Sequence, residues 1–159
     1  MWYFIRTQLK EEIVENEDRW RPILNEVDYD TYDRVSNSFD HTGVGPATHD
    51  QWMEMPASGL LIAQKFKVVV QFLSPYDQSE TYFPMFDGPH SVEEHAFVSF
   101  AFVNKNHFIK IELAEGAPMP KLNPSWRKWR YEEASEWETV YDDRIQRVDV
   151  RSPQYFDLT

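Results

Sequence analysis

His107 is the residue whose type and position best suit catalytic chemistry. It follows the polar turn Asn104-Lys105-Asn106 and opens a stretch in which apolar and polar residues alternate. An imidazole at a strand end beside a loop can be reached by a substrate and oriented by a hydrogen bond, so it could act as a general base. The structural alternative for a single histidine is a cap on the turn, and the residues leave both roles open.

The other histidines offer weaker chemistry. His90 and His95 flank Glu93-Glu94 in HSVEEH, which contains metal-ligand residue types. The spacing differs from HExxH and the segment has the composition of a loop, so we expect no metal site. The GVG of residues 43–45 neither follows a predicted strand nor precedes GK[ST], so we expect no phosphate loop and no bound cofactor.

The sequence contains no cysteine and no GxSxG motif. The absence of cysteine excludes disulfides, thiolate metal ligands and a cysteine nucleophile on this polypeptide. The absence of GxSxG removes the usual sequence signal of a serine nucleophile on a strand-to-helix turn.

The charge of the chain bears on its partners. There are 27 acidic and 16 basic residues, a net charge of −11, whereas nucleic acids and anionic membranes are bound through Lys and Arg. WRKWR, residues 126–130, is a basic and aromatic cluster that could stack single-stranded bases. We expect it instead to enter a helix with its long side chains lying along apolar surface, and we expect neither nucleic acid nor membrane as a partner.

His107 must be positioned by a hairpin. Residues 96–103 form an apolar run typical of a strand covered on both faces. After the turn, His107, Ile109, Ile111 and Leu113 alternate with polar or aromatic residues, which predicts a second strand with His107 on its core-facing side.

The remaining pattern predicts an α+β domain with a central mixed or antiparallel sheet flanked by helices. Residues 1–148 are expected to form this domain and residues 149–159 a tail. Further strands are predicted at 67–73 and 81–86, and a Pro-rich connector at 114–126. The predicted helices cover residues 2–24 with a break at Asn16-Glu17-Asp18, a short segment from Asp30, residues 52–66 and residues 132–148.

The two ends of the sequence carry further signals. The helical pattern already runs at Met1 without a preceding cap, so we expect a segment upstream. No window approaches the length and apolarity of a membrane span, and the N-terminal residues do not resemble a signal peptide. We therefore expect an intracellular protein, in the cytoplasm or nucleus.

Several strings, in their order and spacing, resemble the ovarian-tumour (OTU) family of cysteine proteases, particularly the divergent domains of plant and transposon-derived proteins. The resemblance covers nearly the whole chain. Its parts are WYFIRTQLKEEI, QWMEMPASGLLIAQKFKVVVQFLS, ETYFPM, FAFVNKNHFIKIEL, APMPKLNPSW and EEASEWETVYDDRI.

The resemblance implies an OTU-like fold and an isopeptidase mechanism of acyl transfer. In that mechanism a cysteine at the start of the first helix attacks the carbonyl and a histidine takes its proton. His107, in an N-H-[FY] setting, matches that histidine. The motif of the nucleophile, Asp-Gly-Asn-Cys, would lie before Met1 and is absent, and Ile109 stands where many members have an acidic or amide residue.

The resemblance therefore implies an N-terminally truncated, deubiquitinase-type domain that is inactive as this chain. Ubiquitin or a ubiquitin-like protein is the partner it implies. The alternative is a non-catalytic module that binds ubiquitin or another protein. The missing thiol and the acidic surface favour this alternative.

Overall fold

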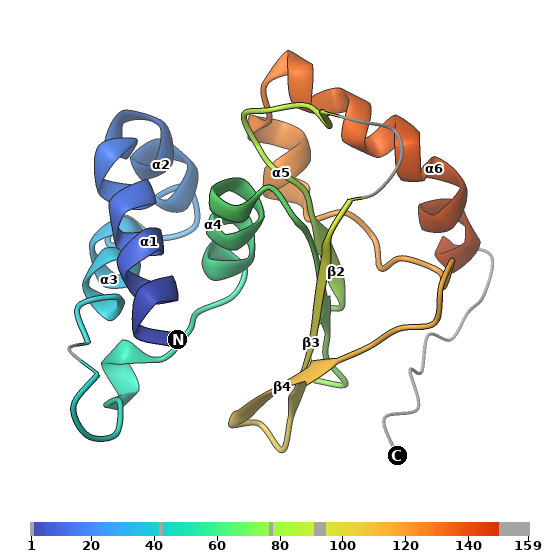
Figure 1. The fold of residues 1–159 in the computed structure, drawn as a ribbon. Coiled ribbons are helices and arrows are strands. Elements are labelled where there is room, and N and C mark those ends of the chain that lie inside the picture. The colour runs from blue at the N-terminus through green and yellow to red at the C-terminus, as the bar shows by residue number, and fades with distance from the viewer. Residues whose placement is uncertain (1, 42, 77, 91–94, 150–159) are drawn as a thin grey trace.

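The computed structural model describes residues 2–41, 43–76, 78–90 and 95–149. These residues form a mixed α+β architecture with a four-stranded sheet and six α-helices (Figure 1). None of the described helices combines the length and the hydropathy that a membrane-spanning helix requires. In chain order the elements are α1 (Trp2–Glu15), α2 (Glu17–Leu24), α3 (Thr31–Ser38), the 3-10 helix η1 (His49–Gln51), α4 (Ala57–Phe66), β1 (Val69–Leu73), β2 (Glu80–Tyr82), β3 (Phe97–Val103), β4 (His107–Ile111), α5 (Pro124–Trp129), the 3-10 helix η2 (Glu132–Ser135) and α6 (Glu136–Asp149).

The sheet has the strand order β2-β1-β3-β4 and is mixed. β1 pairs antiparallel with β2 and parallel with β3, and β3 pairs antiparallel with β4. The parallel pair forms although β1 and β3 are far apart in the chain. Phe72 lies opposite Glu80 on β2 and opposite Phe100 on β3, so the register places these three residues in one row across the sheet.

Helices cover the two faces of the sheet unequally. α4 lies between the N-terminal helices α1–α3 and one face, and its apolar residues Leu60 and Leu61 are buried (Figure 1). α5 and α6 cover part of the opposite face, where Phe83 stacks on Trp137 at a ring-centroid distance of 5.7 Å. Because α4 is packed on both sides, it joins the N-terminal helices to the sheet.

The helix pattern read from the sequence is largely confirmed. The predicted break after the first helix falls at Asn16, between α1 and α2, and α3 begins at Thr31. The predicted last helix appears as η2 followed by α6, with the predicted apolar face: Trp137 and Ile145 are buried.

Three departures from the predicted elements occur at prolines. α4 begins at Ala57 instead of Trp52, because Pro56 precedes its first turn. β2 ends at Tyr82 instead of Phe86, since Pro84 has no N–H for a ladder. The connector is not wholly irregular: α5 begins at Pro124, where Asn123 caps the helix by accepting a hydrogen bond from the backbone N–H of Trp126 at 3.2 Å.

Candidate functional site

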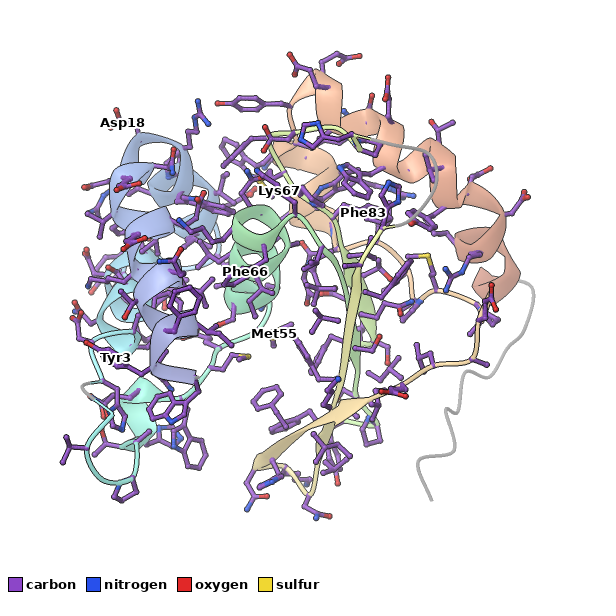
Figure 2. The ribbon with its side chains drawn as sticks, in the orientation of Figure 1. Tyr3, Asp18, Met55, Phe66, Lys67 and Phe83 are labelled. Atoms are coloured by element: carbon purple, nitrogen blue, oxygen red, sulfur yellow. The ribbon has the colours of Figure 1, made fainter. Side chains whose placement is uncertain are left out.

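A groove with a volume of about 560 Å³ runs between residues 49–56 and the sheet. Apolar side chains from both sides dominate its lining. The 49–56 segment contributes Trp52 and Met55, while the sheet contributes Phe72, Phe102 and Phe108. In Figure 2 Met55 lies just before the N-terminal end of α4, between that helix and the sheet. Concave, mostly apolar sites with a few polar groups are the usual form of binding sites.

Two arginines hold the 49–56 side of the groove in place. Arg6 of α1 donates hydrogen bonds to the carbonyl oxygens of Ser38, at 2.5 Å, and Gln51, at 2.7 Å. Arg34 of α3 donates to both carboxylate oxygens of Glu54, at 2.7 and 2.9 Å, and these hydrogen bonds raise the pKa of Arg34. The segment has little regular structure, so these contacts fix it against the N-terminal helices.

Aromatic rings packed at tilted or edge-on angles form the sheet side of the groove. The ring of Phe72 lies 6.1 Å from that of Phe108, and Phe108 lies 4.9 Å from Phe102. Tyr76, in the turn after β1, packs edge-on against Phe102 at 6.2 Å, and the Lys105 ammonium lies 5.5 Å from the Tyr76 ring. The hairpin of β3 and β4 is therefore joined to the sheet through its aromatic face.

Glu80 supplies a carboxylate to the lining of the groove. Its Oε2 accepts hydrogen bonds from the Tyr82 hydroxyl at 2.9 Å and from the Asn123 Nδ2 at 2.8 Å. Burial raises the pKa of Tyr82, and the nearby Glu80 charge raises it further, so this hydroxyl remains a donor.

The predicted hairpin and turn around His107 are confirmed. β3 and β4 are joined by Asn104-Lys105-Asn106, and His107, the first residue of β4, lies opposite Val103. Asn104 and Lys105 adopt left-handed φ values of 53° and 58°. Asn tolerates this region better than most residues, which suits it to the tight turn.

The predicted orientation of His107 is wrong. The side chain is exposed and lies on the strand face opposite Phe108, so His107 does not line the groove. Phe108 contacts the core instead, because the aromatic side of the sheet covers that face of β4. On the His107 face the side chain of Ile109 is 39% exposed, so it is open to solvent. The imidazole has no hydrogen-bond partner among the described residues.

Two further histidines, His41 and His95, contact different residues. His41 is buried, its Nδ1 accepts the Gly43 backbone N–H at 2.8 Å, and its ring meets that of Trp2 edge-on at 4.8 Å. His95 lies 2.5 Å from the Tyr141 hydroxyl. Within HSVEEH, residues 91–94 lie outside the described residues, and the described part of the chain holds no cluster of three His, Asp or Glu side chains arranged to bind a metal.

The WRKWR cluster forms the C-terminal part of α5 and its C-cap, Arg130, so it lies at the end of a helix and not at the predicted helix entrance. Trp126 is buried and donates from its indole N–H to the Pro84 carbonyl at 3.0 Å. Arg127 pairs with Glu138 at 2.5 Å, and Lys128 pairs with Glu26. These two cations are thus engaged by carboxylates of the same chain.

The sequence analysis did not single out Glu80, Tyr82 or Asn123. One signal for Asn123 was present, because Asn followed by Pro is typical of a helix N-cap and first turn. Nothing local indicated that Glu80 and Asn123, which are 43 positions apart, share a hydrogen bond. Comparison of the chain with family models, with curated proteins and with solved structures finds no match.

Proposed function

We propose that this chain is an OTU-like domain of the cysteine-peptidase lineage that binds ubiquitin or a ubiquitin-like protein. The observation that carries the proposal is the aromatic groove between residues 49–56 and the β3–β4 hairpin. The groove lies between the N-terminal part of the molecule, which contains α1, and the β3–β4 hairpin, in which His107 is the first residue of β4. A hydrolytic pair of the OTU type requires its two halves on these two elements.

Binding is better supported than hydrolysis for this polypeptide. Without a cysteine it has no thiolate to form an acyl-enzyme intermediate. The His107 imidazole also lies on the strand face away from the groove. A histidine that serves as general base must come within hydrogen-bond reach of the nucleophile, so catalysis would require a different arrangement of the first residues of β4.

The charge of the chain is compatible with the proposed partner. The net charge of −11 suits a basic partner surface, and the recognition face of ubiquitin is basic and apolar. Trp52 and Met53, which are 45% and 37% exposed, extend the apolar lining of the groove to the surface. Exposed aromatic residues at a groove are frequent anchors of protein interfaces.

The proposal is tested by titrating ¹⁵N-labelled ubiquitin with the chain and following amide chemical shifts. We expect a contiguous set of shifts on ubiquitin and an affinity that falls about tenfold in Trp52→Ala, because the indole offers a large apolar surface. Trp2→Ala is the matched control: Trp2 is also 45% exposed but packs on His41 and does not line the groove. No shift at millimolar concentration would end the proposal.

The peptidase lineage has its own test. A version of the chain extended before Trp2 by a segment carrying Asp-Gly-Asn-Cys is assayed with a fluorogenic ubiquitin reporter. We expect turnover in the extended chain, none in the present chain, and a loss of about 10² to 10⁴-fold on His107→Asn. Because His107 is exposed, its substitution leaves the fold intact. If the extended chain binds ubiquitin and turnover is absent or does not depend on His107, the domain is a binding module without a peptidase mechanism.

A further inference from the structure

The Glu80 carboxylate is held in place by neutral donors alone. The Tyr82 hydroxyl and the Asn123 amide donate to the same oxygen, Oε2. Both donor residues are buried, Tyr82 at 0% and Asn123 at 3% exposure, so the carboxylate has little freedom to turn. Its other oxygen, Oε1, has no hydrogen-bond partner among the described residues.

Among the described residues, Glu80 differs from the other half-buried carboxylates in lacking a cation. The buried Glu12 also forms no ion pair with a described residue, but its Oε1 accepts the indole N–H of Trp20 at 3.1 Å and it does not line the groove. The other half-buried carboxylates of the described residues each form an ion pair with Arg or Lys: Asp30 and Glu54 with Arg34, Asp87 with Lys67, and Glu138 with Arg127. Glu80 is half-buried as well and forms none with a described residue. A partly desolvated carboxylate without a cation is unfavourable unless a bound cation or hydrogen-bond donors compensate for the lost hydration.

The surroundings of Glu80 suit a cationic group that is flanked by apolar groups of the same ligand. Phe72 lies directly opposite Glu80 in the β1–β2 register, and its ring is followed by that of Phe108 along the groove. The faces of aromatic rings attract cations, and a carboxylate beside them adds a direct charge partner. Lys105 also lines the groove, but its ammonium lies over the Tyr76 ring and forms no ion pair with Glu80.

We propose that Glu80 recognises a basic side chain, Arg or Lys, of an extended segment that occupies the aromatic groove. The inference rests on the proposed function, in which the groove receives part of a protein partner. Glu80 is then the residue that selects a cationic position in that segment, while the aromatic rings contact the apolar residues on either side of it. The Oε1 atom of the Glu80 carboxylate accepts the new hydrogen bond, and the Oε2 atom keeps the two hydrogen bonds that it already accepts.

The probe is a capped Leu-Arg-Leu tripeptide, compared with the same peptide carrying citrulline, which has the shape of arginine without its charge. Binding is measured from chemical-shift changes of the ¹⁵N-labelled chain. We expect the arginine peptide to bind about tenfold more tightly than the citrulline peptide to the unaltered chain. In Glu80→Gln that preference should fall to near unity, because glutamine still accepts from Tyr82 and Asn123 but carries no charge.

Glu112→Gln is the matched control, since Glu112 is exposed, lies outside the groove and gives the same change in net charge. It should keep the preference for arginine. Equal binding of the two peptides to the unaltered chain, binding of neither, or an unchanged preference in Glu80→Gln would each overturn the inference. A thermal melt of each variant identifies loss of folding as a separate cause.

The same variants separate this inference from the proposed function. If ubiquitin binds and its affinity is the same in Glu80→Gln, while the peptides are not discriminated, the proposed function stands and the role of Glu80 falls. If ubiquitin does not bind but the unaltered chain prefers the arginine peptide through Glu80, the inference stands and the proposed partner falls.

Discussion

Gly59 lets α4 approach β2 so closely that a single added methyl group should destabilise the domain. A Cβ atom at this position would lie 2.7 and 2.8 Å from two ring carbons of Tyr82 and 2.8 Å from the terminal methyl of Met55. Met55 ends in a flexible methyl group that can move. The Tyr82 ring cannot move easily, because it is fully buried and its hydroxyl is bonded to Glu80.

Two opposing effects set the size of the change in Gly59→Ala. Replacing glycine inside a helix by alanine stabilises the helix by about 1 kcal/mol. Overpacking a well-filled core costs about 1–3 kcal/mol, and a contact below 3 Å with an immobile ring belongs at the upper end. The net result is a loss of about 2 kcal/mol in the free energy of unfolding, so the clash outweighs the gain in helix propensity.

Urea denaturation followed by tryptophan fluorescence measures this loss. With a slope of about 2 kcal/mol per molar urea, the midpoint should fall by about 1 M. Ser58→Ala is the control in the same helix. Ser58 is 1% exposed and its hydroxyl has no hydrogen-bond partner in the described parts of the chain, and alanine removes an atom instead of adding one. Its midpoint should stay the same or rise. If Gly59→Ala is as stable as the unaltered chain, the close packing of α4 on Tyr82 is not the constraint that this reasoning requires.

Two further predictions concern polar contacts. Burial opposes the ionised form of Asp87, but hydrogen bonds from Lys67 and Gln64 outweigh it and lower the pKa of this carboxyl below its ordinary 3.8. The ionised Asp87 carboxylate therefore stabilises the fold above pH 3.8, and this contribution is lost as the pH falls below that value. In a plot of unfolding free energy against pH, Asp87→Asn should reduce the fall in stability on the acid side. An unchanged acid side would contradict this prediction. Asn123→Ala should lower the free energy of unfolding by about 1–3 kcal/mol, because it removes both the cap of α5 and a donor to Glu80. Asn123→Ser keeps the cap oxygen, so denaturation should show a smaller loss, and an equal loss would mean that the cap contributes nothing.

The elements that local pattern specifies could be predicted from the sequence. The turn at Asn104-Lys105-Asn106 and its two strands were predictable because turn residues separate two runs with strand character. The apolar face of α6, with Trp137 and Ile145, follows from helical spacing.

What could not be predicted depends on contacts between distant residues. Alternation in β4 separates two faces but does not say which one is covered, so His107 was assigned to the core although Phe108 packs there. The groove requires residues 49–56 to lie across from the hairpin, an arrangement fixed by Arg6 and Arg34 reaching from two different helices. No spacing in the sequence encodes such a contact. Whether the chain shares the OTU lineage stays a proposal for the binding and turnover experiments.

Gln64 of α4 is buried, and its side chain connects the helix to the segment after β2. Its amide oxygen accepts the backbone N–H groups of Met85 and Phe86 at 2.8 and 2.9 Å, and its amide nitrogen donates to Asp87 at 2.7 Å. The Gln64 side chain thus accepts backbone N–H groups of this segment, as the carbonyl groups of a neighbouring strand do in a β-sheet. The segment consequently cannot open by local fraying while α4 stays docked, so the two belong to one cooperative unfolding unit.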